Sequence, residues 1–164
     1  EPETDARSLV DMQLETFKNK TASLDWDAAR KLGLSEYQVL TVASMVEPEA
    51  RVPEERPLVA SVIYNRLGSG MKLEIDATVQ YALGYWKTDL TAEDLQTDSA
   101  YNTRLYGGLP PGPICNPGLD SIQAALHPAS VDYIYYVATG DAAGHHKFTS
   151  SYDEFLQASA ERQR

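Results

Sequence analysis

The chain has 164 residues, of which 43% are hydrophobic and 23% are charged, with a net charge of −10. This length and composition are typical of one globular domain over residues 1–164 with a core of its own. The acidic balance, without a cluster of Lys or Arg, argues against nucleic acid as a partner. The single cysteine, Cys115, cannot form an internal disulfide and leaves no thiolate pair for a structural zinc site.

No apolar run is long enough for a membrane span or a signal peptide. The sequence begins at Glu1 without methionine, so we expect it to have been cut from a longer protein.

The first half of the sequence predicts helices. Apolar residues recur at helical spacing over residues 5–20, which predicts an amphipathic helix with one face packed on the body. A short helix should follow and end at Gly33. Ser35 is the expected N-cap of the helix that carries Glu47, and Pro53 and Pro57 bracket the start of the next helix.

The second half is more broken. In chain order we expect a short strand at 72–75, a short helix near 79–83, a capping box at 91–94 opening another short helix, a long loop at 99–116, a helix starting at 116–117, strands at 133–139 and 147–149 that form an antiparallel hairpin, and a last amphipathic helix around 155–156. The fold class is therefore α+β, with several helices packed with a small, mainly antiparallel sheet.

The stretch that ends at Glu47 and Pro48 is the first candidate for chemistry. If it is helical, Glu47 shares a face with Leu40, Ala43 and Ser44, and Pro48 favours a bend or an end of the helix at Glu47. A carboxyl group sheltered among apolar side chains keeps its proton to higher pH, as a general acid must. Glu49 should point away from that face into water. The plainer alternative, that Glu47 is a carboxylate at the N-terminal end of the following helix, stays open.

Other chemistries find less support. The sequence has no phosphate-binding glycine loop and no Gly-x-Ser-x-Gly elbow. His145 and His146 are adjacent in the expected hairpin, so they point to opposite faces, and no third metal ligand has suitable spacing. No lysine has the phosphate-binding company that pyridoxal phosphate requires, so we expect no cofactor. Tyrosines in the loop and sheet suit sugar rings, although core packing explains them as well.

An ordered set of motifs carries a resemblance to a known family. The motifs are VASMVEPE at 42–49, VASVIYNRL at 59–67, MKLEIDATV at 71–79, AYNT at 100–103, GLPPGPI at 108–114, NPG at 116–118 and the strand at 133–137. Together they resemble the catalytic domain of the endolytic murein transglycosylases, the MltG or YceG-like family. The resemblance covers residues 40–148, with the motifs in the same order.

The resemblance implies an enzyme, a peptidoglycan lytic transglycosylase that cleaves MurNAc–GlcNAc bonds of nascent glycan strands. It implies action at the extracytoplasmic face of the bacterial cytoplasmic membrane, with peptidoglycan synthases as further partners. It also implies that the full-length protein has an N-terminal membrane anchor and a LysM-like segment, both outside this sequence.

The family's catalytic glutamate corresponds to Glu47 and its second glutamate to Glu49. Polar residues at helix and turn ends, and the prolines of the long loop, should converge around Glu47 as substrate-binding groups. These residues are Asn65, Arg66, Asp76, Thr78, Tyr101, Asn102, Thr103, Pro110, Pro111 and Asn116. Glu49 is expected to bind substrate as well, from the opposite side of the helix. For any one of them a structural role as a cap or turn former is equally open.

The implied reaction needs a single carboxyl group. That group protonates the glycosidic oxygen and then takes the proton of the C6 hydroxyl of the same MurNAc, which closes a 1,6-anhydro ring. A hydrolytic muramidase, with Glu49 or Asp76 as a second carboxylate, is one alternative. A non-catalytic peptidoglycan-binding module is another.

Overall fold

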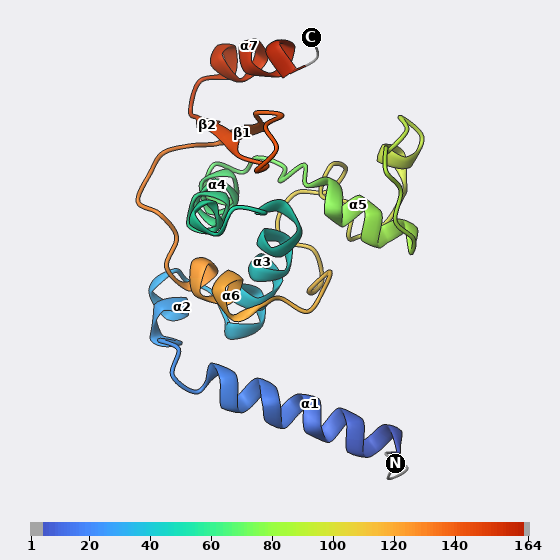
Figure 1. Ribbon diagram of the computed structural model, residues 1–164, viewed down its shortest axis with the longest axis vertical. Helices are drawn as coiled ribbons and strands as arrows, with labels where there is room; N and C mark the ends of the chain where they lie inside the picture. Colours follow the sequence, from blue (N-terminus) through green and yellow to red (C-terminus); the bar gives the residue numbers. More distant parts are fainter. Residues whose placement is uncertain (1–4, 163–164) are drawn as a thin grey trace.

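The computed structural model describes residues 5–162, and its elements follow one another as helices with a late hairpin (Figure 1). The helices are α1 (Ala6–Thr21), α2 (Asp27–Lys31), α3 (Glu36–Glu49), α4 (Arg56–Gly68), α5 (Asp76–Leu83), α6 (Leu119–Leu126) and α7 (Tyr152–Arg162), with 3-10 turns η1 (Pro53–Glu55) and η2 (Asp94–Gln96). The strands β1 (Tyr135–Ala138) and β2 (His146–Thr149) form a two-stranded sheet. The expected α+β class with a small antiparallel sheet is confirmed.

Helix α3 is the centre of the core. It begins at Ser35, whose side chain accepts a hydrogen bond from the backbone N–H of Gln38, while the Gln38 side chain accepts the N–H of Ser35. This reciprocal capping box confirms the expected start of the helix. Val39, Val42 and Met45 are fully buried along it. Buried apolar residues of α4 and α6, including Ile63 and Leu126, join them in one cluster.

The β1–β2 hairpin covers the C-terminal end of α3. Tyr136 is paired with Phe148, and Ala138 with His146, in the antiparallel register. Helix α7 packs on the hairpin, where Phe155 stacks on Tyr135 with ring centroids 5.2 Å apart. The hairpin expected from the sequence is confirmed, and its second strand begins one residue earlier than expected.

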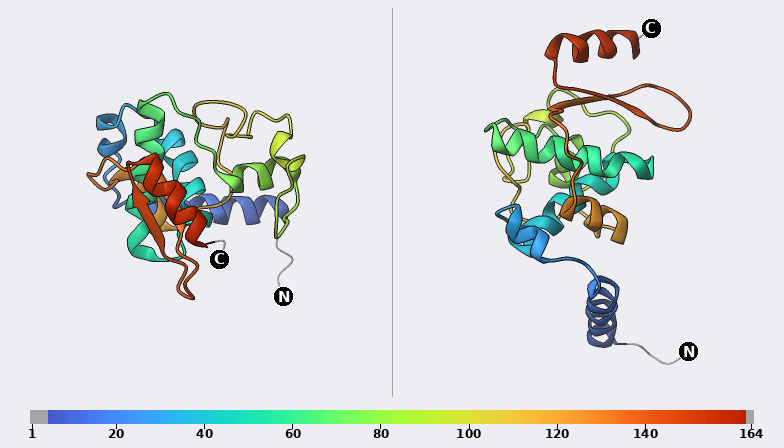
Figure 2. Two further views of the ribbon diagram at one scale, coloured as in Figure 1. Left: turned by 90° about the horizontal axis from the view of Figure 1, so that it is seen from above. Right: turned by 90° about the vertical axis from the view of Figure 1, so that its left-hand side faces the viewer.

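Helix α1 forms as expected, but it does not pack one face on the body. It extends away from the other helices (Figures 1 and 2), and the side chains of Leu9, Met12 and Phe17 remain 40–50% exposed. Among its residues only Thr21, at its last position, is buried. The amphipathic pattern therefore predicted the helix correctly. The prediction that one face of this helix packs on the rest of the domain was wrong.

Two further expectations are corrected. Residues 72–75 form no strand. The carbonyls of Lys72 and Leu73, which would accept hydrogen bonds from a neighbouring strand, accept them from the guanidinium of Arg66 in α4 instead. The capping box of Thr91 and Asp94 is present, but it opens only the 3-10 turn η2. In the described part of the chain, no helix is both long enough and apolar enough to cross a membrane.

Candidate active site

Helix α3 continues through Pro48 to Glu49, so it does not end at Glu47, which was one of the two expected outcomes. Proline has no N–H, and the carbonyl of Ser44 therefore lacks its usual helical donor. The thiol of Cys115 lies 3.2 Å from that carbonyl oxygen and donates to it, while the Ser44 hydroxyl accepts the N–H of Ile114. The thiol of the long loop thus donates to the carbonyl that Pro48 leaves without a helical donor.

Glu47 faces the same loop. Its Oε2 accepts a hydrogen bond of 2.9 Å from the N–H of Gly118, the N-cap residue of α6. The residue is half-buried, and this hydrogen bond connects it to the first turn of α6. This arrangement suits a structural contact that anchors α6 on α3. The expectation that Glu47 is the more sheltered of the two glutamates is therefore wrong.

Glu49 occupies the sheltered position instead. Its Oε2 accepts a hydrogen bond of 2.9 Å from the hydroxyl of Tyr136 on β1. Burial raises the pKa of the Glu49 carboxyl, the Tyr136 hydrogen bond opposes this rise, and the negative charge of Asp76 adds to it. Glu49 was expected to face away from Glu47, as it does, but it faces the groove described next and not open water.

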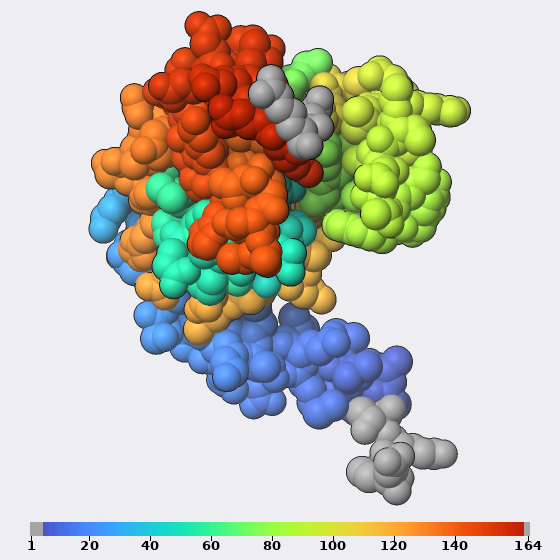
Figure 3. All heavy atoms as spheres, turned by 45° about the horizontal axis from the view of Figure 1, so that its top comes forward, coloured from blue at the N-terminus to red at the C-terminus, as the bar shows by residue number. Residues whose placement is uncertain are grey.

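A groove of about 940 Å³ runs past Glu49 between the hairpin with α7 on one side and α5 with residues 71–76 on the other. Figure 3 shows this side of the molecule, with the orange and red residues of the hairpin and α7 beside the yellow-green segment after α5. The residues that line the groove are Glu49, Arg66, Met71, Leu73, Glu74, Asp76, Arg104, Tyr135, Tyr136, Val137, Ala138, His146, Tyr152, Phe155, Ser159 and Arg162.

Among the residues expected at the site, Arg66 and Asp76 line this groove together with Glu49. Arg66 is 8% exposed and fixes the groove wall, because its guanidinium donates to Ile134 O at 2.7 Å and to Leu73 O at 2.8 Å. Asp76 is paired with Arg104, whose Nε lies 2.6 Å from Oδ1. The two charges of this pair belong to the rim, since the Asp76 side chain is 55% exposed.

Other expected residues do not converge on either glutamate. Asn65 lies on a different groove and donates to the carbonyls of Val131 and Tyr133. Thr78 and Thr103 are buried and hydrogen-bonded to each other at 2.9 Å, and buried Asn102 donates to two backbone carbonyls. Thr78 and Thr103 support the segment that carries Asp76, because both hydroxyls bond the backbone of Ile75. None of the four lines the Glu49 groove.

The remaining members belong to the long loop. Tyr101 packs against Tyr81, with ring centroids 4.6 Å apart. Pro110 is buried, whereas Pro111 and Asn116 are exposed. None of them lines the Glu49 groove. Their predicted role as substrate-binding residues remains a prediction.

Sequence reasoning missed Tyr136 as a partner of the acid and missed the pair formed by Glu55 and His146. One signal for Glu49 was present in the sequence. Positions 42, 45 and 46 lie one and two turns before Glu49 on its own helix face, and they hold Val, Met and Val, all fully buried. The face of Glu47 carries the smaller Ala43 and Ser44. The larger buried side chains on the face of Glu49 therefore indicated that Glu49 is the more sheltered glutamate.

Comparisons with known proteins agree with the motifs. The YceG-like family matches residues 1–161. An endolytic murein transglycosylase of Bacillus subtilis is 41% identical over 145 residues, which are 88% of this chain and 38% of the relative. One from Streptococcus pneumoniae is 35% identical over 140 residues, 82% of this chain and 25% of the relative.

The fold has a solved counterpart as well. The crystal structure of a YceG-like protein from Listeria monocytogenes superposes with a TM-score of 0.88 at 37% identity, over 96% of this chain and 50% of that chain. The chain thus spans half or less of the length of these relatives. With the family matched over nearly the whole chain and the fold shared, the chain belongs to the YceG-like family.

Proposed function

We propose that this chain is the catalytic domain of an endolytic murein transglycosylase, which cleaves glycan strands of peptidoglycan between MurNAc and GlcNAc. The observation that carries the proposal is a sheltered carboxyl group, Glu49, whose pKa is raised by burial within a groove of about 940 Å³. The names of the relatives from Bacillus subtilis and Streptococcus pneumoniae support the same substrate class.

In this mechanism Glu49 enters the reaction with its proton. It gives the proton to the glycosidic oxygen as the bond to the MurNAc C1 breaks, and becomes a carboxylate. The carboxylate then takes the proton of the C6 hydroxyl of the same sugar while the oxygen of that hydroxyl bonds to C1. Glu49 thus gives one proton and takes one back, and no water is consumed.

Tyr136 suits both halves of this cycle. Its hydroxyl donates to Oε2 of Glu49, so the carboxylate formed after the first step is stabilised where it stands. The same bond fixes the orientation of the carboxyl group within the groove. An acid that must give one proton and take it back needs a pKa that is neither too high nor too low. Burial raises the pKa of Glu49, and the hydrogen bond from Tyr136 lowers it.

The groove has the chemistry that sugars require. Tyr135, Tyr136 and Tyr152 offer aromatic faces, and the charged rim offers hydrogen-bond partners for hydroxyl and amide groups. The rim charges are mostly paired within the protein, Asp76 with Arg104 and Arg66 with Glu74. A largely neutralised rim favours a polymer of sugar rings over a highly charged ligand.

A hydrolytic muramidase is the second candidate, because Asp76 lines the same groove as Glu49 and could hold a water. The pairing of Asp76 with Arg104 at 2.6 Å argues against that use. The earlier prediction that Glu47 is the acid also remains testable, although its hydrogen bond to Gly118 gives it a structural task.

The test is product analysis in ¹⁸O-water. Purified murein glycan is digested with the protein, and the new MurNAc ends are examined by mass spectrometry. The expected product carries 1,6-anhydroMurNAc without label, because the nucleophile is the sugar's own hydroxyl. Labelled reducing ends would identify a muramidase, and an absence of cleavage by folded protein that binds the glycan would leave only a binding module.

The place of action follows from the substrate. Peptidoglycan lies outside the cytoplasmic membrane, so we propose that the domain works at the extracytoplasmic face. The membrane anchor, the LysM-like segment and the synthase partners implied by the family resemblance belong to the same proposal for the whole protein.

A further inference from the structure

Glu55 and His146 form a mostly buried pair beside the proposed acid. The side chains are 9% and 12% exposed, and Glu55 receives two hydrogen bonds from the same residue. Its Oε1 accepts the backbone N–H of His146 at 2.9 Å, and its Oε2 lies 2.7 Å from the ring nitrogen Nδ1. An ionised carboxylate can only accept, so Nδ1 carries the hydrogen.

This contact determines what the other ring nitrogen can do. In a neutral imidazole with the hydrogen on Nδ1, Nε2 carries a lone pair and is a hydrogen-bond acceptor. Among residues 5–162, no atom forms a hydrogen bond with Nε2 of His146. This nitrogen is also not among the fully buried polar atoms without partners in that part of the chain. In its neutral form His146 would therefore present an open acceptor, and the side chain lines the Glu49 groove.

The ring is held close to the acid. His146 meets the ring of Tyr136 edge-on, with centroids 5.4 Å apart and an interplanar angle of 86°. The hydroxyl of Tyr136 in turn donates to Glu49. The orientation of the imidazole is thus fixed from two sides, by Glu55 and by Tyr136, in the same groove where the glycan should bind.

We propose that His146 is a substrate-binding residue whose Nε2 accepts a hydrogen bond from a sugar hydroxyl, in the tautomer that Glu55 imposes. The identity of the ligand as a glycan rests on the proposed function, whereas the tautomer does not. A bound strand offers a hydroxyl donor on nearly every ring, and an acceptor held rigidly in the wall selects among them at little cost in conformational entropy.

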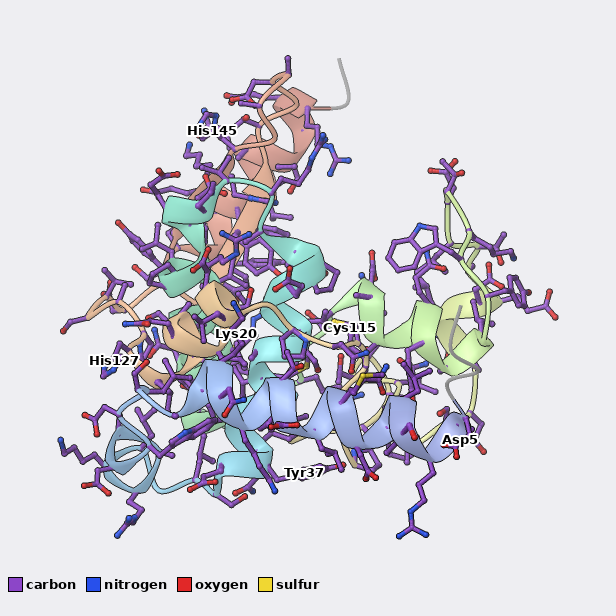
Figure 4. All side chains as sticks on the ribbon, turned by 60° about the horizontal axis from the view of Figure 1, so that its bottom comes forward. Asp5, Lys20, Tyr37, Cys115, His127 and His145 are labelled. Carbon is purple, nitrogen blue, oxygen red and sulfur yellow. The ribbon has the colours of Figure 1, made fainter. Side chains whose placement is uncertain are left out.

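The chain contains a matched control in the preceding residue. His145 also faces a carboxylate, with its Nδ1 2.7 Å from Oδ2 of Asp141, but it lies at the exposed turn of the hairpin (Figure 4). It does not line the groove. The two histidines therefore share their carboxylate contact and differ in access to the groove.

The first measurement is ¹⁵N NMR of the histidine rings in the Glu49→Gln protein, which is expected to bind glycan without cleaving it. At neutral pH the free protein should show Nε2 of His146 without a hydrogen and Nδ1 with one. Glu55→Gln should reverse this, since an amide group donates to Nδ1 and transfers the ring hydrogen to Nε2. A doubly protonated His146 ring, or hydrogen on Nε2 in the Glu49→Gln protein, would overturn the proposal.

The second measurement is titration with a tetrasaccharide of alternating GlcNAc and MurNAc. Nε2 of His146 should change its ¹⁵N shift as the sugar binds, and the rings of His145 and His127 should not. In the same Glu49→Gln background, His146→Asn keeps an amide near Nδ1 but removes the acceptor, so the affinity should fall about threefold to tenfold. His146→Gln, which reaches the Nε2 position, should restore part of it, and His145→Asn should change nothing.

The outcomes separate the two proposals. Sugar binding with an unchanged His146 ring, or equal losses for His145→Asn and His146→Asn, overturns the role of His146 and leaves the proposed function intact. No binding of the tetrasaccharide by any of the proteins overturns the proposed function and, with it, this role.

Discussion

The hydroxyl of Tyr136 donates a hydrogen bond of 2.9 Å to the carboxylate of Glu49, across 87 positions of sequence. Tyr136 belongs to the hairpin and Glu49 to the last turn of α3, so the environment of the proposed acid exists only when the hairpin covers the end of that helix. Burial by this cover raises the pKa of Glu49, and burial with the neighbouring carboxylate raises that of Tyr136 well above its ordinary value.

The first prediction compares the two glutamates of α3. Glu49→Gln should lower glycan cleavage by about 10²–10⁴-fold, because it removes the proton donor but keeps the shape of the side chain. Glu47→Gln should retain activity within about tenfold, since the amide oxygen can still accept the N–H of Gly118. The measurement is the rate of release of soluble products from murein.

Circular dichroism and thermal unfolding of both variants provide the control for folding. If folded Glu47→Gln loses activity by a hundredfold and folded Glu49→Gln does not, the role of acid returns to Glu47, as the sequence first indicated.

The second prediction concerns stability and pH. The pKa of Glu49 is raised by burial from its ordinary value of 4.5, so the folded state binds this proton more tightly than the unfolded state. Stability from this group is therefore lost as pH rises from 4.5 through the folded pKa. The amide of Glu49→Gln does not titrate. The Tm of this variant minus that of the parent should therefore grow as pH rises from 4.5 through the folded pKa of Glu49.

For a chain of this size each 1 kcal/mol corresponds to about 2–4 °C in Tm, so the difference is measurable by calorimetry. Glu54→Gln, at an exposed carboxylate of η1, serves as the control for the removal of one carboxylate by the same substitution. A Glu49→Gln protein less stable than the parent at neutral pH would contradict the inferred cost of burying this charge.

The third prediction tests the Tyr136 hydrogen bond. Tyr136→Phe keeps the ring between Glu49 and His146 but removes the donor, which lowers the pKa of Glu49 in the parent. The pKa of Glu49 should therefore rise in the variant, and the alkaline limb of the pH–rate profile, on which the rate falls as Glu49 loses its proton, should move toward higher pH. The maximal rate should fall as well, because the carboxylate formed in the first step loses its stabilising donor. An unchanged profile would mean that the hydroxyl does not act on Glu49 during the reaction.

The local signals of the sequence predicted the frame of the fold. Ser35 and Gln38 are three residues apart, and their capping box is a local interaction, so the start of α3 was correct. The hairpin was correct for the same reason, since β-branched and aromatic residues and a glycine turn are read within one short stretch. Helical geometry also predicted correctly that Glu47 and Glu49 diverge.

The choice between the two glutamates could not be predicted locally. Glu47 receives the N–H of Gly118, 71 residues away, and Glu49 receives the hydroxyl of Tyr136, 87 residues away. Which side of α3 becomes a groove depends on where α6 and the hairpin pack, and those contacts are set by the whole core. The same distance explains the missed pair of Glu55 and His146, whose contact spans 91 positions.

The last prediction concerns Gly112 in the long loop that lies over α3. A Cβ at this buried position would overlap Oη of Tyr37 and come within 3.3 Å of its Cζ, whereas a Cβ at Gly107 in the same loop would meet nothing within 4 Å. Gly112→Ala should therefore displace the Tyr37 ring and cost up to about 1 kcal/mol of unfolding free energy in urea, and Gly107→Ala should cost less. Because Tyr37 is 56% exposed, the clash lies with one surface side chain, and Tyr37→Ala should relieve it. The double variant should then be more stable than the sum of the two single changes predicts, and strict additivity would place the cost of Gly112→Ala in the backbone of the loop.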